Sequence, residues 1–257
     1  MEPADEGQQA VLEGHIAIQA ALEANSRPVY TVYIDRASRD RHGDLARLAR
    51  TAEVAGVPVE RVDAAAIAAR ASGQTHGGAI ALCGPRRFVP LERLLPSDGH
   101  APFIAMIDGV EDPFNFGQAI RALYAAGADG LVVRPRNWMS AAGIVGRASA
   151  GASERLPTAV AEEAEEAARF FRARGLTIAA TAYLPRAVAL YDADLTGPLF
   201  LLIGGEKRGV TRSFLERADL VLQIPYGRRF AGSLGTTAAA AVLAFEIMRQ
   251  RRGLLRE

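Results

Sequence analysis

The sequence has little of the material that builds disulfide-linked, metal-binding or membrane-spanning proteins. Cys83 is the only cysteine among 257 residues, so an internal disulfide and a thiolate metal cluster are excluded, and we expect a small buried side chain there. The four histidines lack the spacing of metal ligands. No apolar run reaches the roughly 18 residues that cross a bilayer, and the amino-terminal residues are acidic and polar, unlike a secretory signal. These features predict a cytoplasmic protein that requires no metal.

An excess of charge of one sign is also missing, because the formal net charge is only +1. So weak a field does not by itself indicate a polyanionic partner. Four arginines between residues 134 and 155, and the adjoining Arg228 and Arg229, are candidates for phosphate contacts. Lys207 is, however, the only lysine among the 30 lysine and arginine residues, so arginine stands here wherever any cation would serve. For most individual arginines, solvation is therefore the favoured interpretation.

The first hundred residues alternate helical and strand patterns, as expected of a small α/β domain. We predict helices over 11–24 and 44–56 and strands over 28–34, 57–62 and 77–84. A proline-rich stretch then predicts a linker near residues 92–101. We place the domain boundary there, which gives domains 1–97 and 98–257.

The second part of the chain repeats the alternation with more apolar strands. We predict strands over 103–107, 130–133, 176–181, 199–203 and 220–224, and helices from residue 113 and over 162–174, 211–217 and 236–251. Continuous apolar strands separated by helices are typical of a mainly parallel sheet covered on both faces. The fold class is therefore α/β.

Three polar loops follow predicted strands, where open parallel sheets bind their ligands. They are DGVEDPFNFG, GGEKRG and PYGRRFAGSLGTT, which begin at residues 108, 204 and 225. In the first loop, Asp112 suits the N-cap and Pro113 the first helical turn, so Asn115 lies at the mouth of a helix. Arg121 follows by almost two turns and projects about 120° away from Asn115, toward either a ligand or a salt-bridge partner.

Nucleotide-binding loops of the common kinds are not present. The second loop lacks the spacing of a P-loop, and Glu206 would repel a phosphate. No G-x-G-x-x-G pattern follows the strand at 103–107, so a dinucleotide-binding fold has weak support. Taken alone, the glycine-rich second loop is equally well a plain turn.

Taken together, the three loops resemble the three motifs of the SpoU (TrmH) family of RNA ribose 2′-O-methyltransferases, which belongs to the SPOUT class. DGVEDPFNFGQAIRAL resembles the first motif, LIGGEKRGV the second and IPYGRRFAGSLGTTAAAAVLAFE the third. Residues 148–157, ASAGASERLP, are similar to a further stretch that borders the site. Residues 11–95 resemble the L30e-like RNA-binding domain of the longer family members.

The resemblance implies a carboxyl-terminal SPOUT domain with a parallel sheet and a deep trefoil knot, a homodimer, and S-adenosylmethionine as cofactor. It implies methylation of a ribose 2′-hydroxyl in structured RNA, with ribosomal RNA favoured because of the amino-terminal domain. The resemblance assigns the catalytic site to Arg121, Asn115, Glu206 and Ser233. It assigns cofactor binding to Leu202, Gly204, Gly205, Glu206, Gly209, Ile224, Ser233 and Leu234.

One position departs from the third motif. Gly235 stands where the family usually has asparagine, so an amide that could bond across the site is missing. A hydroxyl of Thr236 or Thr237 is a possible substitute, and Thr236 is also a candidate N-cap of the last helix. Two other interpretations therefore stay open. One is a non-catalytic RNA-binding or ribosome-assembly factor, and the other a transfer RNA 2′-O-methyltransferase.

Overall fold

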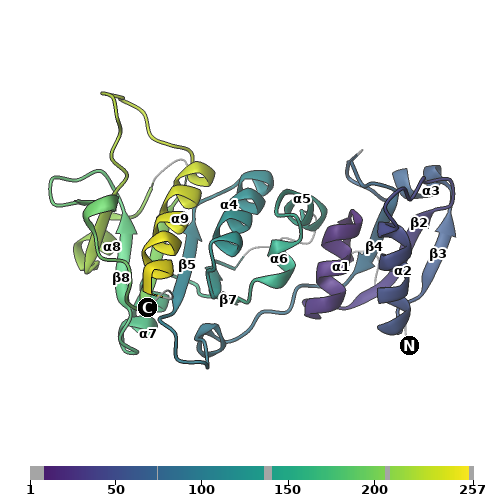
Figure 1. Cartoon of the computed structure of the whole chain (residues 1–257), viewed down its shortest axis with the longest axis horizontal. Coiled ribbons are helices and arrows are strands. Elements are labelled where there is room, and N and C mark those ends of the chain that lie inside the picture. The colour runs from purple at the N-terminus through teal and green to yellow at the C-terminus, as the bar shows by residue number, and fades with distance from the viewer. Residues whose placement is uncertain (1–8, 74, 136–140, 206–208, 255–257) are drawn as a thin grey trace. The chain divides into compact units, whose positions relative to one another are not determined.

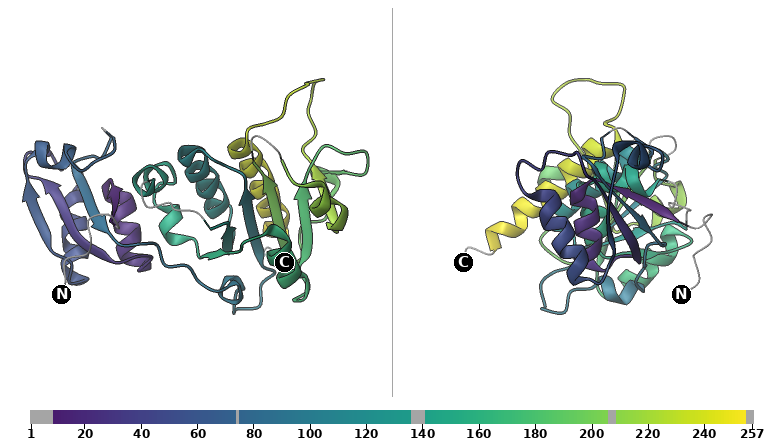
Figure 2. Two further views of the ribbon diagram at one scale, coloured as in Figure 1. Left: turned by 180° about the vertical axis from the view of Figure 1, so that it is seen from behind. Right: turned by 90° about the vertical axis from the view of Figure 1, so that its right-hand side faces the viewer.

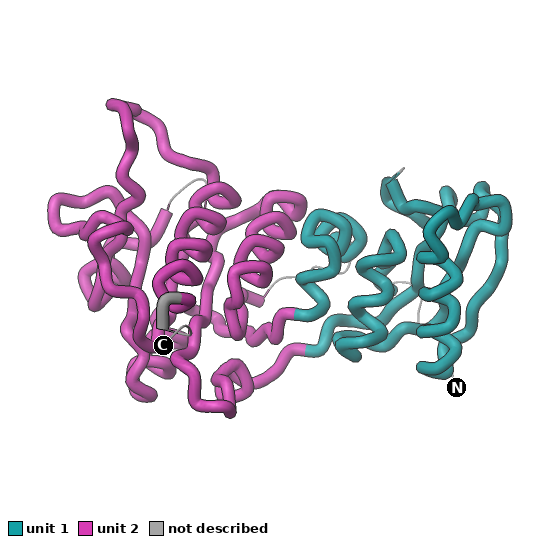
Figure 3. The backbone as a smooth tube through the Cα atoms, viewed as in Figure 1, with its two compact units in different colours: residues 1–87, 136–155 teal, residues 88–135, 156–257 magenta. Residues whose placement is uncertain are grey.

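The computed structural model describes residues 9–73, 75–135, 141–205 and 209–254. The chain forms two compact units (Figure 3). Unit 1 contains residues 1–87 and 136–155, and unit 2 contains residues 88–135 and 156–257. Residues 141–155 thus pack with the amino-terminal part of the chain, although they lie beyond the boundary that the sequence suggested at residue 97.

Unit 1 is built on a four-stranded mixed sheet (Figure 1). Its strand order is β1 (Ala10–Glu13), β4 (Ala79–Cys83), β2 (Val29–Asp35) and β3 (Val59–Val62). β4 pairs antiparallel with both β1 and β2, whereas β2 and β3 are parallel. The helices of this unit are α1 (His15–Ala24), α2 (Asp44–Val54), α3 (Ala64–Ala68), α5 (Ala142–Ala148) and α6 (Ala152–Arg155).

The prediction of one helix over residues 11–24 is wrong at its beginning. Residues 10–13 form strand β1, and α1 begins only at His15. Gly14 separates the two with φ 86°, a left-handed conformation that glycine adopts without strain. The apolar residues Val11 and Leu12 fit both a helical stripe and a strand, and pairing with β4 decides for the strand.

Buried charges connect the distant segments of unit 1. Glu154 of α6 is 3% exposed and accepts hydrogen bonds from Arg27 through both carboxylate oxygens, at 2.9 and 3.0 Å. Ser26 and Arg86 donate to the same carboxylate at 2.5 and 3.1 Å. Because each buried charge has a partner, this cluster fixes α6 against the amino-terminal residues.

Small residues bring α5 equally close to the rest of unit 1. A Cβ atom on Gly143 would lie 2.9 Å from the carbonyl oxygen of Val11. Arg147, one turn further on, forms an ion pair with the fully buried Glu13 at 3.1 Å. The segment 142–155 therefore belongs to the core of unit 1 by packing as well as by charge.

Unit 2 contains a seven-stranded sheet in which every paired neighbour is parallel. The strand order is β7 (Thr158–Val160), β6 (Gly130–Val133), β5 (Phe103–Asp108), β10 (Leu199–Gly204), β8 (Thr177–Thr181), β11 (Leu220–Gln223) and β9 (Val188–Ala189). The predicted parallel sheet is confirmed. The trefoil knot stays a prediction, since strand order and pairing do not define how a chain is threaded.

Helices cover both faces of this sheet (Figures 1 and 2). Phe200 and Leu202 of β10 belong to a cluster with α7 (Ala164–Arg172), in which Phe171 stacks on Phe200 at 5.1 Å between ring centroids. Because side chains alternate along a strand, Leu201 points to the opposite face. There α9 (Thr236–Leu254) contacts β10 and packs on α4 (Pro113–Ala125). The remaining short helices are α8 (Arg212–Arg217) and the 3₁₀ turns at Leu91–Leu94 and Leu190–Asp192.

Two sequence-based expectations concern cysteine and membrane spans. Cys83 is fully buried and unpaired, and burial raises the pKa of its thiol to about 12, so it is an inert core side chain as expected. In the part of the chain that the structure describes, no helix combines the length and hydropathy that a bilayer crossing requires. Within the same residues, no group of three or more His, Cys, Asp or Glu side chains could hold a metal ion.

Candidate active site

A large cavity lies at the carboxyl edge of the unit 2 sheet, where the sequence predicted ligand binding. Its volume is about 910 Å³, which is within the range of small-molecule sites. The cavity is bounded by the ends of β8, β10 and β11 and by the first turns of α9. Its lining includes Thr181, Tyr183, Gly204, Gly205, Gly209, Ile224, Tyr226, Phe230, Ser233, Leu234 and Thr236.

The first motif forms the turn from β5 into α4. Asp112 caps α4, because its carboxylate accepts from the backbone N–H of Asn115 at 2.9 Å, and Pro113 occupies the first turn. Both predictions are confirmed. Asn115 is half-buried at this helix mouth, whereas Arg121 is exposed and forms no ion pair with any described residue. Its guanidinium is therefore available to a ligand.

The second motif requires glycine because two backbones approach each other closely. A Cβ atom on Gly205 would lie 2.1 Å from the carbonyl oxygen of Gly109, in the first motif. On Gly204 it would lie 2.7 Å from the carbonyl carbon of Gly209. Gly204 and Gly205 thus lie so close to neighbouring backbone that a side chain would not fit at either position.

Two threonines at the start of α9 bond to the other motifs. The Thr236 hydroxyl donates to the carbonyl oxygen of Gly204 and the Thr237 hydroxyl to that of Asn115, both at 3.2 Å. Gly235 rather than Thr236 occupies the N-cap position, since its carbonyl accepts the first helical bond, from Ala239 at 3.0 Å. The predicted cap at Thr236 is therefore wrong, because that hydroxyl is directed to the second motif. The idea that a threonine hydroxyl bonds across the site agrees with this geometry.

The predicted site residues that the structure describes lie in three places. Six of the proposed cofactor residues line the cavity, namely Gly204, Gly205, Gly209, Ile224, Ser233 and Leu234. The side chain of Leu202 is instead buried beneath the sheet with the α7 cluster. Asn115 and Arg121 lie on α4, outside the cavity lining, and Glu206 lies outside the described residues.

Sequence reasoning did not name several residues that line the cavity. Thr181 is the last residue of β8 and Tyr183 follows it. This strand was predicted correctly, so the rule that ligands bind at the carboxyl ends of strands could have identified both residues. Tyr226 and Phe230 lie within the stretch that resembles the third motif, but no role was assigned to them. Whether their side chains reach the cavity depends on the conformation of the loop, which cannot be predicted from the sequence.

Most of the candidate phosphate-binding arginines near residues 134–155 have structural partners. Arg134 forms a two-point ion pair with Asp108 at 2.7 and 2.8 Å, and this hydrogen bonding raises the pKa of the guanidinium. Arg147 pairs with Glu13 and Arg155 with Glu23. Arg136 lies outside the described residues. These three pairs favour stability over RNA contact.

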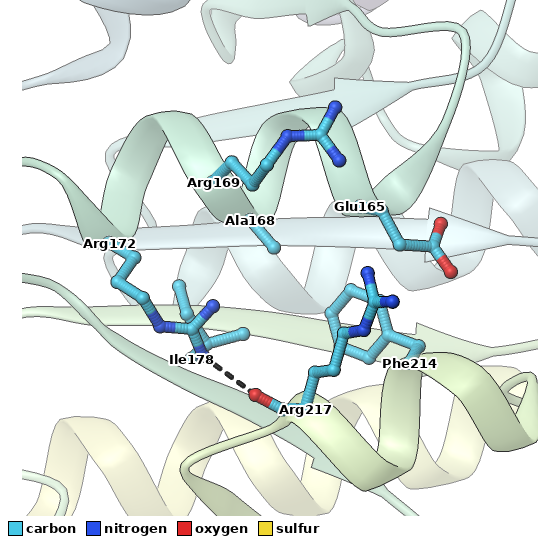
Figure 4. Close-up of a pocket in the computed structure, with 7 residues that line it drawn as sticks. All are labelled: Glu165, Ala168, Arg169, Arg172, Ile178, Phe214 and Arg217. Atoms are coloured by element: carbon cyan, nitrogen blue, oxygen red, sulfur yellow. Dashed lines mark hydrogen bonds between the residues drawn. The ribbon is translucent and has the colours of Figure 1, made fainter.

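A second cavity lies between α7 and α8, lined by Arg169, Arg172 and Arg217 among others (Figure 4). Its volume of about 30 Å³ has room for about two water molecules. Arg172 donates to the carbonyl oxygen of Arg217 and pairs with Asp219 at 2.9 Å. This cavity is too small for a nucleotide and one of its cations is already paired, so the cavity at the sheet edge is the candidate site.

Comparison with known families divides the chain in two. Residues 102–245 match the SpoU rRNA Methylase family, and residues 11–89 match the family of RNA 2′-O ribose methyltransferase substrate-binding domains. The first match runs from β5 into α9 and therefore includes all three loops.

Individual proteins are similar over nearly the whole chain. A 23S rRNA (guanosine-2′-O-)-methyltransferase RlmB from Shewanella oneidensis is 28% identical over 95% of this chain and 98% of its own. The protein of the same name from Pseudomonas putida is 29% identical over 92% and 94%. The crystal structure of an AdoMet-bound rRNA methyltransferase from Sinorhizobium meliloti superposes with a TM-score of 0.77 at 25% identity, covering 95% of this chain and 88% of that one.

Proposed function

The chain belongs to the SpoU rRNA methylase family as an S-adenosylmethionine-dependent RNA 2′-O-ribose methyltransferase, and we propose that its substrate is a guanosine ribose in 23S ribosomal RNA. The observation that supports this most is that the first motif contacts the second and third motifs, which line the cavity. Gly205 touches Gly109, and Thr236 and Thr237 bond to the carbonyls of Gly204 and Asn115. The substrate assignment draws on the relatives named for 23S ribosomal RNA. A ribosomal substrate also predicts a cytoplasmic location.

The cavity fits S-adenosylmethionine by shape and by chemistry. Three glycines leave backbone groups uncovered along one wall, where an adenine and an amino-acid moiety can find hydrogen bonds. We propose that the cofactor is held by Leu202, Gly204, Gly205, Glu206, Gly209, Ile224, Ser233 and Leu234, with Leu202 contributing only its backbone. The cofactor supplies an electrophilic methyl group on a sulfonium, and this chemistry needs no metal.

We propose that Arg121 holds the RNA phosphate beside the reacting ribose. A guanidinium stays protonated in proteins and is therefore a poor general base, but it binds a phosphate through two parallel hydrogen bonds. Its exposure and its freedom from ion pairs with described residues suit this role. Fixing the phosphate aligns the 2′-oxygen for attack, and alignment of this kind accounts for large rate factors.

Asn115, Glu206 and Ser233 are proposed to order the same site. Asn115 stands at the capped end of α4, and its carbonyl is bonded by Thr237. Ser233 lines the cavity close to the start of α9. These positions allow both side chains to orient ligands without taking a proton from the ribose.

The division of labour and the oligomeric state are also proposals. Residues 1–97 are proposed to bind RNA and residues 98–257 to carry out transfer, which the two family matches support. We propose a homodimer formed through α4 and α9. These helices pack together and expose Phe114, Tyr124 and Phe245, and such exposed aromatics favour a protein interface.

The test combines calorimetry with a transfer assay on 23S ribosomal RNA. We expect the protein to bind S-adenosylmethionine and its demethylated product, and to transfer the methyl group. Arg121→Ala should reduce transfer by at least roughly 100-fold, because positioning of the ribose is lost, while cofactor affinity changes less than about threefold. Arg212→Ala, which removes another exposed arginine, serves as control.

Equal loss of cofactor binding and transfer in Arg121→Ala would refute the proposed role of Arg121. A wild-type protein that binds RNA but neither binds the cofactor nor transfers a methyl group would be a non-catalytic RNA-binding factor. In that case Gly235→Asn is the first reversion to examine.

A further inference from the structure

The loop from β11 to α9 displays aromatic side chains to solvent. This loop, residues 224–235, extends away from the sheet of unit 2 (Figures 1 and 2). Phe230 is 61% exposed and Tyr226 is 41% exposed. Aromatic rings are normally withdrawn from water unless they serve an interaction, so this exposure requires an explanation.

The ring of Phe230 is held in place although it is exposed. It lies against the backbone of Gly232, where an added Cβ would come within 2.6 Å of the ring. The Tyr226 ring contacts it from another side, with centroids 5.9 Å apart. The Tyr226 hydroxyl in turn accepts from the backbone N–H of Leu234 at 3.0 Å. These contacts therefore fix the orientation of the exposed Phe230 ring.

The charge beside this ring is positive, and no described acidic side chain pairs with it. Arg228 and Arg229 are exposed, and neither forms an ion pair with any residue that the structure describes. The segment IPYGRRFAGSLG contains no aspartate or glutamate. An aromatic surface flanked by free guanidinium groups is the combination with which proteins bind unpaired bases and their phosphates.

We propose that Phe230 stacks on an unpaired base of the substrate RNA next to the methylated nucleotide, while Arg228 and Arg229 bind the adjoining phosphates. This inference rests on the proposed function. The cofactor adenine is a poorer occupant, because S-adenosylmethionine carries a net positive charge that two free arginines would repel. RNA phosphates are attracted by the same arginines.

The test compares variants at position 230 by RNA affinity, measured as fluorescence anisotropy of a labelled 23S RNA fragment. Phe230→Leu keeps the apolar volume but removes the aromatic face, so RNA affinity should fall roughly 5- to 100-fold. Phe230→Tyr keeps the face and should stay within about threefold of the wild type. Phe88→Leu alters another exposed phenylalanine, 45% exposed and outside the loop, and should have no effect.

The contribution of Arg228 and Arg229 is tested by the salt dependence of RNA binding. Replacing both Arg228 and Arg229 by glutamine should reduce the slope of log affinity against log salt concentration by about 1.4, since each phosphate contact in a single strand contributes about 0.7. Phe230, Arg228 and Arg229 also line the cavity, so cofactor affinity, measured by calorimetry, can change in these variants, but it should fall less than RNA affinity does.

Three results would overturn the proposal. Phe230→Leu with unchanged RNA affinity would exclude stacking, an equal loss of cofactor affinity would assign the ring to the adenine, and a changed oligomeric state would assign it to a second copy of the chain. Failure of the proposed function looks different. It would appear as absence of methyl transfer by the wild type, whether or not Phe230→Leu weakens RNA binding.

Discussion

The interiors of the two units are stabilised by different kinds of interaction. The sheet of unit 2 is covered by apolar side chains, such as Phe171, Phe200 and Ile178. Unit 1 has a smaller apolar core and also buries the charged side chains Glu13, Arg27 and Glu154. Apolar packing tolerates local change, whereas a buried charge that loses its partner is strongly unfavourable. Unit 1 should therefore be the more sensitive to single substitutions.

The comparison also explains why chemistry is placed in unit 2. The carboxyl ends of parallel strands lie at one edge of the sheet. Apolar packing on the two faces stabilises the sheet, so the loops at this edge can carry polar, functional residues. In unit 1 the buried charged groups are paired internally, as Arg27 and Arg86 are with Glu154.

The largest expected effect comes from breaking the buried cluster of unit 1. Glu154→Gln leaves Arg27 and Arg86 without a counter-charge. We expect the free energy of unfolding to fall by about 3–5 kcal/mol. Urea unfolding measures this. The control is Glu216→Gln, which removes an exposed pair with Arg212 and should change stability by less than about 0.5 kcal/mol. Similar small effects in both variants would contradict the contrast between the units.

Acid should affect the same cluster. Burial alone would raise the pKa of Glu154, but the positive charges of Arg27 and Arg86 outweigh it and hold this pKa below its usual value of 4.5. A carboxylate with a lowered pKa in the folded state stabilises the fold at all pH values above its unfolded pKa, and the contribution disappears as pH falls through the folded value. We expect the urea midpoint of the wild type to decline below pH 4.5, and Glu154→Gln to show a smaller decline.

A smaller effect on stability, but a larger one on ligand binding, is expected at the edge of unit 2. Gly205→Ala forces a Cβ to within 2.1 Å of the Gly109 carbonyl, so the second loop must move away from the first. We expect roughly 1–3 kcal/mol of destabilisation and at least about tenfold weaker cofactor binding by calorimetry. Gly197→Ala, with open space around the added atom, is the matched control. Unchanged cofactor affinity in Gly205→Ala would show that this contact does not shape the site.

The smallest expected effect concerns the bridge from α9 to the first motif. Thr237→Val keeps the shape but removes the hydroxyl that bonds to the Asn115 carbonyl, so stability should fall by about 1 kcal/mol. Methyl transfer should decrease more than cofactor affinity, because Asn115 is proposed to order the reacting groups. Thr196→Val removes a hydroxyl that bonds to Asp194 on the surface and should leave transfer unchanged. A parallel loss of transfer in both variants would argue against the bridge.

Much of unit 2 was readable from the sequence because its apolar runs are continuous. Residues 103–107 and 199–203 were predicted as strands and lie in β5 and β10. Their position at the centre of the sheet requires apolar side chains on both faces, and this leaves a clear pattern. The site followed from the same strands, since its loops are the residues that come next.

Unit 1 was less readable, for physical reasons. Val11 and Leu12 fit either a helix or a strand, and only pairing with β4 decides. Residues 142–155, AGIVGRASAGASER, carry mostly small side chains without a clear periodicity, so α5 and α6 were missed. From the sequence, Glu154 would be expected on the surface. No local pattern indicates that it pairs with Arg27, which lies 127 residues earlier in the chain. Such long-range pairs are specified by the folded structure as a whole.

The most direct test of the central claim is to locate the methyl group on the RNA. After incubation of unmodified 23S ribosomal RNA with the protein and S-adenosylmethionine, alkaline hydrolysis reveals every linkage whose 2′-oxygen is blocked, since that oxygen is the nucleophile of the cleavage. We predict one newly resistant linkage, on the 3′ side of a guanosine, which is absent with Arg121→Ala. Methyl transfer that leaves every linkage cleavable, or no transfer at all, would contradict the account.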